Sequence, residues 1–400
     1  MSQEILTQSL LLPDLRFVKK EQKDSDYFIY CDKVSGFEVC PHCANKCFSV
    51  YDHVTVTIKD EPIRNRYVYL KIKKRRFHCK PCNRIFREPV GGIYKGFRTS
   101  ERFRRYIRML ASECHNLKQV TKKASCSSWL VYTAFYQQLE LEQRKYNCPW
   151  PKTIGIDEHS FIRNVKGAGR DFVTVFIDYT NKRMKEVVLG KSLHDLTTNS
   201  NLNNIIGREN VQNVVLDLSP TFRSFVQSYF PRAKMIADKF HVVKLMHPLL
   251  HEYRKKVINE NELSKKRNNP VVRLLVTYRK KLRVEQRWAL DQFLDLNHEI
   301  KEVYWYQQRL YSMYRIKGYN HARRALQALL DDMARSKIKA VLSYRQTFKK
   351  WYWEIFNYFS TRLNNGRIEG YNRKAKLVQR CAYGFRSFKN YRLKLLYSCR

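Results

Sequence analysis

Four of the chain's 11 cysteines stand in two C-x-x-C pairs, and this spacing strongly limits what the N-terminal part can fold into. Cys40-Pro-His-Cys43 and Cys79-Lys-Pro-Cys82 flank residues 44–78, in which apolar and polar residues alternate as in β-strands. Each C-x-x-C turn can place two thiolates on one ion, and hairpins between the pairs bring the two turns together. The pattern therefore predicts a zinc ribbon within residues 1–90, closed by a structural Zn²⁺ on four thiolates. Unliganded thiols are the alternative, which the proline within each pair disfavours.

The chain carries a large positive charge. Its 400 residues include 77 Lys and Arg against 36 Asp and Glu, a formal net charge of +41. Such an excess repels itself unless a polyanion neutralises it, so nucleic acid is the expected partner. Within the ribbon, Arg75 and Arg76 belong to a basic stripe that we expect to lie on DNA phosphates, although a solvated strand edge would give the same pattern.

An anionic membrane surface would also attract this charge. Proteins that bind one usually carry a single basic amphipathic helix, whereas here the charge is spread along the chain. No apolar run reaches the ~18 residues that span a bilayer, and the N-terminus lacks the basic region of a signal peptide. We therefore expect no membrane partner, reduced cysteines and a cytosolic location.

Residues 91–148 show helical periodicity. Apolar residues recur at helical spacing from Phe103 to Ala111, a second short helix is expected over 117–124, and Ser125-Cys126-Ser127 interrupts the pattern before a third helix. This layout predicts a helix-turn-helix whose third helix, with Ser128 and Trp129 at its start, enters the major groove of DNA. A three-helix packing unit without DNA contacts would produce the same pattern.

The sequence changes in character after Cys148-Pro-Trp-Pro151. Residues 149–245 predict three consecutive strands, a helix, and then a strand, a helix and a last strand over KMIADKFHVV. This is the element order of a ribonuclease H-like α/β catalytic domain. Residues 246–358 contain long amphipathic segments that predict an all-helical insertion. Residues 359–400 are expected to complete the catalytic core with a final helix and a basic tail.

Three acidic residues stand where a metal site can form. Asp157 and Asp217 each follow a short apolar run typical of a buried strand, and the carboxyl ends of neighbouring strands form one crevice. Glu369, the only acidic residue between 361 and 400, lies beside the apolar face of the final helix. Carboxylates that share a site repel one another unless a cation such as Mg²⁺ (or Mn²⁺) lies between them. The three acids together therefore predict a two-metal centre for phosphodiester displacement.

Other polar residues accompany these acids. On the final helix, Glu369 is followed by candidate phosphate-binding side chains, namely Asn372, Arg373, Lys374 and Lys376. Asp238 and His241 are reserve metal ligands, and His241 is otherwise an ordinary hydrogen-bonding residue.

Three segments resemble the motifs of DDE transposases of the ISL-three insertion-sequence family: GIDEHSF, VVLDLSPTF with FPRAKMIADKFHVVK, and GRIEGYNRKAKLVQRCAYGFRSFKNY. The resemblance covers nearly the whole chain, including the zinc ribbon and the helix-turn-helix. It implies that Asp157, Asp217 and Glu369 are the catalytic triad, that Mg²⁺ is the working metal, and that terminal inverted repeats in double-stranded DNA are the substrate. It also implies a bacterial, nucleoid-associated cytoplasmic protein, and cleavage of paired ends makes a homodimer the expected assembly.

Three functions remain open on the sequence alone. The first is a transposase that cleaves element ends and joins their 3′-hydroxyls to target DNA. The second is a non-catalytic, sequence-specific DNA-binding regulator, which the intact acids disfavour because a binding module has no need to place three carboxylates against a phosphate backbone. The third is a structure-specific nuclease without strand transfer, which only the absence of joined products would distinguish from the first.

Overall fold

The computed structural model describes residues 12–114, 116–145, 148–162, 170–261 and 270–400. The chain divides into two compact units, residues 1–142 and 143–400, which are described here one at a time.

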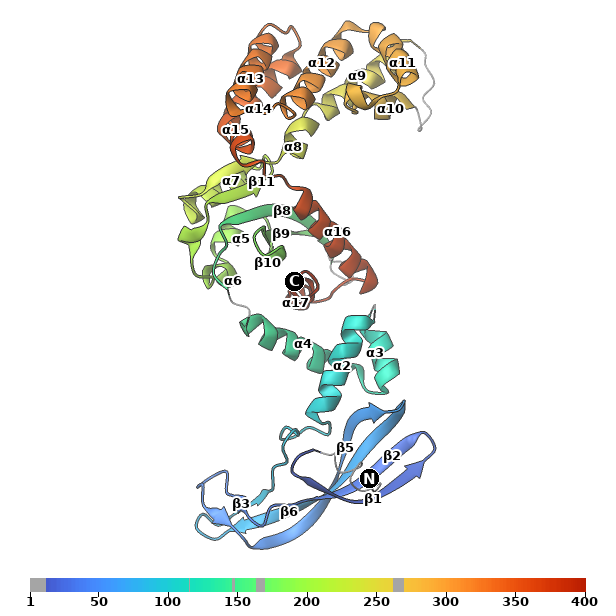
Figure 1. Cartoon of the computed structure of the whole chain (residues 1–400), viewed down its shortest axis with the longest axis vertical. Coiled ribbons are helices and arrows are strands. Elements are labelled where there is room, and N and C mark those ends of the chain that lie inside the picture. Colours follow the sequence, from blue (N-terminus) through green and yellow to red (C-terminus); the bar gives the residue numbers. More distant parts are fainter. Residues whose placement is uncertain (1–11, 115, 146–147, 163–169, 262–269) are drawn as a thin grey trace. The chain divides into compact units, whose positions relative to one another are not determined.

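A five-stranded sheet forms the first part of the N-terminal unit (Figure 1). Its strands are β1 (Leu15–Lys23), β2 (Asp26–Lys33), β5 (Val50–Ile63), β6 (Arg66–Cys79) and β7 (Arg84–Arg87), in the order β1-β2-β6-β5 with β7 also on β6. Arg64 and Asn65 turn the long β5–β6 hairpin with φ of 52° and 61°, as a tight two-residue turn between strands requires. This hairpin, with the small ribbon of β3 (Glu38–Val39) and β4 (Lys46–Cys47), confirms the strands predicted between the two cysteine pairs.

Three helices complete this unit: α2 (Glu101–Glu113), α3 (Leu117–Ala124) and α4 (Ser128–Lys145). The Ser100 hydroxyl accepts a hydrogen bond from the Phe103 amide at 3.0 Å and so begins α2. Ser125 adopts a left-handed conformation, with φ of 46°, which ends α3 and allows the chain to turn into α4. The helices lie where the sequence predicted them.

A second five-stranded sheet forms the centre of the C-terminal unit. Its strands are β8 (Thr153–Ile162), β9 (Arg170–Asp178), β10 (Arg183–Leu189), β11 (Asn213–Leu216) and β12 (Lys234–Ala237), in the order β10-β9-β8-β11-β12. The first three strands are antiparallel, whereas β11 runs parallel to both β8 and β12. The predicted succession of three strands, helical segment, strand, helix and strand is confirmed.

The helices between these strands differ in one respect from the prediction. The single helix expected after β10 is two short ones, α5 (Leu193–Thr197) and α6 (Ser200–Asn203), because the Asn199 side chain caps a new helix by accepting a hydrogen bond from Leu202 at 3.1 Å. A short 3-10 turn, η1 (Arg208–Asn210), leads into β11, and α7 (Pro220–Tyr229) joins β11 to β12.

The predicted last strand over KMIADKFHVV was wrong in its second half. Only Lys234–Ala237 are extended, and Asp238 begins the helix α8 (Lys239–Lys244) by accepting a hydrogen bond from the His241 amide at 3.3 Å. The all-helical block therefore starts one residue after the strand. Its other elements are α9 (His247–Glu260), α10 (Pro270–Leu275), η2 (Arg279–Lys281), α11 (Val284–Asp295), α12 (His298–Met313), α13 (Tyr319–Ala334), α14 (Lys339–Lys350) and α15 (Tyr352–Thr361).

Two helices end the chain, α16 (Gly366–Cys381) and α17 (Phe388–Ser398). The first is the predicted final helix, but the basic tail expected after it is a packed helix. Tyr391 of α17 is buried and stacks on Phe161 of β8 with ring centres 4.7 Å apart, and Arg392 forms an ion pair with Glu186 of β10. Burial of this aromatic ring against the sheet makes α17 part of the core. Within the described residues, no helix is long and apolar enough to cross a bilayer.

Candidate active site

The four predicted zinc ligands come together in the N-terminal unit. The sulfur atoms of Cys40 and Cys82 are 3.6 Å apart, those of Cys43 and Cys79 are 3.4 Å apart, and all four lie within 4.8 Å of one another. Ligands at ~2.3 Å in a tetrahedron stand about 3.8 Å apart, so the spacing fits one zinc ion. Hydrogen bonds from the backbone and side chain of Asn45 lower the pKa of the Cys43 thiol to about 6, which favours the metal-binding thiolate. This is a closed site of the structural kind.

The two predicted aspartates lie on neighbouring strands of the second sheet. The register pairs Gly155 of β8 with Val215 of β11, and continuing it by two residues places Asp157 beside Asp217. Adjacent residues in a parallel pair point to the same face, so both carboxylates face one side of the sheet. One detail of the prediction was wrong: Asp157 lies in the middle of β8, which continues to Ile162, and does not end the strand.

The environment of these two carboxylates disfavours their negative charge. Burial is the main cause that raises the pKa of Asp217 to about 6, and the nearby charge of Asp157 adds to it. Burial likewise raises the pKa of Asp157, opposed by the Glu158 amide that donates to its Oδ1 atom at 2.7 Å. The Oδ1 atom of Asp217 is buried without a hydrogen-bond partner among the described residues. A buried, unpartnered carboxylate oxygen is a ligand atom that a cation would satisfy.

Asp238 extends this row to a third strand. Leu216 pairs with Ala237 of β12, so the next residues, Asp217 and Asp238, are neighbours as well. Asp238 is 1% exposed and both of its oxygens have protein partners: its Oδ2 atom contacts Nδ1 of His241 at 2.8 Å, and its Oδ1 atom accepts from the Asn365 amide at 3.2 Å. Asp238 thus joins the first turn of the helical block to the residue that precedes α16.

His241 faces the same group of acids. The hydrogen bond with Asp238 is the main cause that raises its pKa, and the charges of Asp217 and Asp157 add to this effect. Its side chain is 45% exposed, whereas Asp238 is covered. Of the two reserve ligands, therefore, Asp238 is buried with a protein partner on each oxygen, and the His241 side chain remains partly exposed.

The helix α16 lies along β8 because position 155 has no side chain (Figure 1). A Cβ atom at Gly155 would stand 2.3 Å from Cδ1 of Ile368 and 2.6 Å from Cε2 of Tyr179, closer than atoms can approach. One helical turn after Ile368, the Asn372 side chain donates to Oδ2 of Asp157 at 2.9 Å. Glycine in the strand therefore allows α16 to bring a polar side chain to Asp157.

Glu369 lies on this helix one turn before Asn372, but its carboxylate is turned away from the aspartates. Its Oε1 atom pairs with Arg373 at 2.7 Å, and its side chain is 59% exposed. Within the part of the chain that the structure describes, only the four cysteines bring three or more ligand atoms within 4.8 Å of one another. The structure thus brings Asp157 and Asp217 side by side and places Glu369 on the adjacent helix, paired with an arginine.

The predicted DNA-contacting residues fall into exposed and internally paired groups. Ser128 and Trp129 are exposed at the start of α4, with Trp129 68% exposed, and Lys374 and Lys376 are exposed on α16. Arg75 and Arg76, in contrast, form ion pairs with Glu88 and Asp52. Phosphate binding by these two arginines would have to compete with those carboxylates.

The sequence reasoning did not single out two residues that organise the site. Asn365 is buried, and its side chain reaches Oδ2 of Asp157 at 3.5 Å while its amide binds Asp238. Gly155 lies within the apolar run that precedes Asp157. The signal for Asn365 is the Asn364-Asn365-Gly366 sequence immediately before the helix, and the signal for Gly155 is a glycine inside a strand pattern.

Comparison with known proteins agrees with this geometry. Residues 154–395 match a family model described as transposase, of the DDE type of the ISL-three family. Residues 37–82 match a model described as the zinc-finger of transposase IS204/IS1001/IS1096/IS1165. A relative from Bordetella parapertussis, the transposase for insertion sequence element IS1001, is 22% identical over 378 residues, which cover 92% of this chain and 90% of the relative.

These matches define the class first: the chain is an insertion-sequence transposase, an enzyme class that cleaves DNA and transfers strands. More closely, it belongs to the ISL-three family of DDE transposases, with a zinc ribbon at residues 37–82.

Proposed function

We propose that this transposase binds the terminal inverted repeats of its element, cleaves a phosphodiester at each end and joins the 3′-hydroxyls to target DNA. The observation that carries the proposal is the placement of Asp157 beside Asp217 on adjacent parallel strands, with an unpartnered buried oxygen on Asp217. We infer that the sheet order β10-β9-β8-β11-β12 is that of a ribonuclease H-like nuclease core.

The carboxylates fit a divalent cation of the oxygen-binding kind. Asp157, Asp217 and Glu369 would hold Mg²⁺ or Mn²⁺, which supplies activation of the attacking oxygen and stabilisation of the leaving oxygen in an in-line displacement. Because Glu369 pairs with Arg373 in the structure, it must leave that partner to contribute. An incoming phosphate is a natural competitor for the Arg373 guanidinium, so DNA binding would release Glu369 for the site.

Asn372 acts on the site in a different way. Its amide nitrogen donates to Oδ2 of Asp157, which leaves Oδ1 to the Glu158 amide and fixes the plane of the carboxylate. A carboxylate held in this manner presents its remaining lone pairs in one direction, as outer-shell partners of metal ligands do. Lys374 and Lys376 are exposed on the same helix and would hold phosphates of the bound strand.

End recognition is assigned to the N-terminal unit. We infer that α2 to α4 form a helix-turn-helix in which Ser128 and Trp129 at the start of α4 reach base edges in the major groove. Arg75 and Arg76 on β6 are the proposed phosphate contacts of the ribbon. Because two ends are cut in one transposition event, the proposed assembly is a homodimer on paired ends.

The test uses the full chain with labelled double-stranded DNA that carries the inverted repeats flanking the gene, in the presence of Mg²⁺. We expect nicked and joined products from the unmodified chain. Asp217→Asn and Glu369→Gln should abolish both while DNA affinity is retained. Cleavage that survives both substitutions would sink the assignment of the triad.

The two other functions are outcomes of the same experiment. Nicked products without joined ones would identify a nuclease that does not transfer strands. Salt-sensitive, sequence-specific binding without any metal-dependent product would identify the regulator, which the family assignment disfavours.

A further inference from the structure

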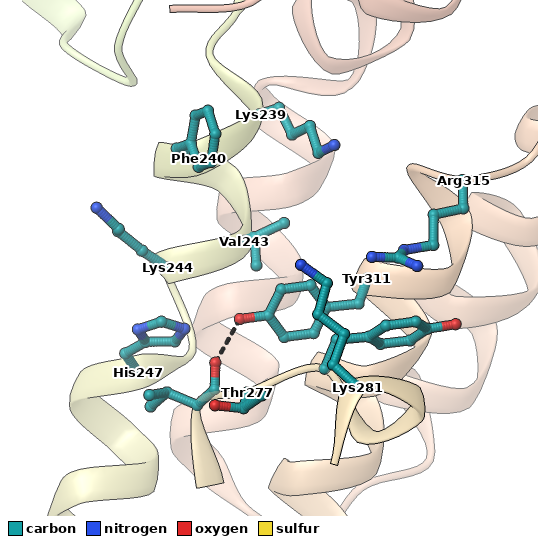
Figure 2. A pocket seen from close by; sticks show the side chains of 11 residues that line it. Lys239, Phe240, Val243, Lys244, His247, Thr277, Lys281, Tyr311 and Arg315 are labelled. Atoms are coloured by element: carbon teal, nitrogen blue, oxygen red, sulfur yellow. Dashed lines mark hydrogen bonds between the residues drawn. The ribbon is translucent and has the colours of Figure 1, made fainter. Parts of the chain in front are cut away.

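A cavity of about 340 Å³ opens in the helical block between α8 and the segment around η2 and α12 (Figure 2). Its volume is in the range of sites that hold one small-molecule-sized group, and it is too small for a DNA duplex. None of its residues belongs to the acidic row of the sheet. The lining residues are Lys239, Phe240, Val243, Lys244, His247, Val276, Thr277, Tyr278, Lys281, Tyr311 and Arg315.

The charged side chains of this cavity are all cations. Lys239, Lys281 and Arg315 are close enough that the two others lower the pKa of Lys239, after burial as the main cause. Figure 2 shows the Lys281 amine and the Arg315 guanidinium directed toward the same space, with Lys244 at the rim. Within the described residues, none of these four cations forms an ion pair or a side-chain hydrogen bond, although the nearby charge of Asp238 partly opposes the lowering of the Lys239 pKa. Three mutually repelling cations around one space favour an anion in it.

The rest of the lining is apolar and aromatic. Val243, Tyr278 and Tyr311 form the wall, and the Tyr311 hydroxyl is already used because it donates to the Val276 carbonyl at 2.6 Å (Figure 2). The Arg315 guanidinium lies 3.9 Å from the Tyr278 ring centre, which holds that cation in place. Phe240 is 46% exposed at the edge of the cavity, where a planar group can stack on it.

A partly buried imidazole also lines the cavity. The Nε2 atom of His247 is buried without a hydrogen-bond partner among the described residues. Burial lowers the pKa of His247 to about 4, so its ring is neutral near pH 7 and offers one donor and one acceptor. An unpartnered buried polar atom in a cationic, aromatic cavity is the kind of group that a bound nucleotide would satisfy.

We propose that this cavity holds a single unpaired nucleotide of the DNA strand, with its phosphate on Lys239, Lys281 and Arg315 and its base against the apolar wall and Phe240. Cations combined with aromatic surfaces are the chemistry by which proteins bind unpaired nucleotides without sequence preference. The position suits a strand that passes the active site, because Lys239 directly follows Asp238 of the acidic row. This assignment rests on the proposed function, since the nucleotide belongs to the DNA that is cleaved.

The first experiment compares two variants that lose the same charge. Lys281→Ala/Arg315→Ala removes two cavity cations, and Arg323→Ala/Arg324→Ala removes two exposed cations of α13 in the same block. Both are made in the Asp217→Asn chain so that bound DNA is not cut, and the affinity for a short labelled single-stranded oligonucleotide is measured at several salt concentrations. We expect the cavity variant alone to weaken binding at least ~10-fold and to reduce the slope of log K against log salt by up to about 0.7, the value for one lost phosphate contact.

A second experiment locates the nucleotide along the strand. An uncharged methylphosphonate linkage is moved position by position through the oligonucleotide. In the Asp217→Asn chain, the uncharged linkage should weaken binding sharply at one or two positions. At those positions the cavity variant should bind no more weakly than the Asp217→Asn chain does, because the phosphate contact that it lacks is already absent. Lys281→Ala alone, which removes no ring contact, guards against misfolding of the double variant and should reduce the slope by about half as much.

The outcomes separate this assignment from the proposed function. Equal effects of the two double variants, or additive losses at every methylphosphonate position, would overturn the cavity assignment. If the unmodified chain cleaves and joins element ends while the cavity variants behave like the α13 control, only the cavity assignment fails. If the chain binds no DNA at all, both proposals fall together.

Discussion

The two sites of this protein, the thiol cluster of the first sheet and the acidic row of the second, are organised in opposite ways. The four sulfur atoms already lie within 4.8 Å of one another, held by two turns that are each local in sequence. In the acidic row, two aspartates are adjacent, while the third expected ligand, Glu369, is paired with Arg373. The four thiol ligands are thus already assembled in the folded chain, whereas the carboxylates of the acidic row are not all gathered around one point.

This difference follows from what each site does. A closed set of four ligands stabilises a fold and leaves no position for a substrate. Under the proposed function, the acidic site must stay open to ions and a phosphodiester, and its carboxylates lie in an environment that disfavours their charge, as the raised pKa of Asp217 indicates. Zinc binding therefore adds stability at the thiol site, whereas the buried charge of the metal-free acidic row lowers stability.

The largest effect is expected from loss of zinc. The core around the thiols consists of Cys40, Cys47, Phe77, Cys79 and Phe86, too few side chains to fold without the metal. Cys43→Ser/Cys79→Ser should therefore abolish hydrogen-exchange protection across residues 38–47 and 77–87, and leave protected both the part of the β5–β6 hairpin that has its own core and residues 170–261. Asp157→Asn, the matched change at the acidic site, should leave both regions folded. Equal protection of the ribbon with and without its thiols would contradict this picture.

The next effect tests how closely α16 approaches the acidic sheet. Gly155→Val should lower the free energy of unfolding by about 3 kcal/mol, because the new side chain meets Ile368 and Tyr179 in a filled core. Adding Ile368→Ala should restore part of that loss, since it removes the nearest atoms. The control is Gly370→Ala, which meets nothing within 4 Å and should stabilise α16 by about 0.5–1 kcal/mol. Urea denaturation measures all three, and no recovery in the double variant would show that the clash lies elsewhere.

A smaller effect is the pH dependence of stability that the acidic row produces. The folded-state pKa of Asp217, about 6, is above its ordinary value of 3.8, so the folded chain favours the protonated carboxyl group. The stability that this group contributes is therefore fully present below about pH 4 and is lost as the pH rises through 6. In magnesium-free buffer, Asp217→Asn should therefore raise the free energy of unfolding by about 2 kcal/mol at pH 7 and have little effect at pH 4.

The matched control for this pH dependence is Asp195, whose pKa is lowered by its hydrogen bond with Ser192. A lowered pKa means stability that is present at neutral pH and lost as the carboxylate is protonated, so Asp195→Asn should destabilise the chain at pH 7 and not at low pH. The same change in stability at both pH values for Asp217→Asn would refute an unfavourable charge at that position.

The smallest effect concerns Asn372. Asn372→Ala removes the donor to Oδ2 of Asp157 and should slow cleavage of element ends about 10-fold, with a higher Mg²⁺ concentration needed for half-maximal rate. Lys374→Ala, two residues further along α16, should weaken DNA binding and leave the Mg²⁺ dependence unchanged. Cleavage rates measured across a magnesium titration distinguish the two variants, and identical titration curves for Asn372→Ala and the unmodified chain would remove Asn372 from the site.

The same contrast explains what the sequence could and could not predict. The zinc ribbon follows from the spacing of Cys40, Cys43, Cys79 and Cys82, because each pair lies within one tight turn. The strands that carry Asp157 and Asp217 follow from apolar runs, since strands buried on both faces are continuously apolar. These are local signals, which depend little on how distant segments pack.

The sequence predictions were wrong where tertiary packing or a helix cap determines the local structure. Asp238 has apolar residues on both sides, a pattern equally typical of a strand, and only its hydrogen bond to the His241 amide makes the second half helical. The helix α17 carries a basic sequence with little apolar periodicity, so its packing through Tyr391 was not recognised. The contact between Asn372 and Asp157 joins residues far apart in the chain and depends on the absence of a side chain at Gly155.

One carboxylate beside the acidic row receives both ends of the helical block: Asp238 caps its first helix and binds the amide of Asn365, where the chain returns. The block is therefore a long excursion whose entrance and exit coincide, although its last helix, α15, also packs on the sheet, where the Asn357 side chain donates to the Met235 carbonyl at 2.7 Å. This arrangement marks residues 238 and 365 as the pair of splice points at which an engineer could graft a different module next to the cleavage chemistry.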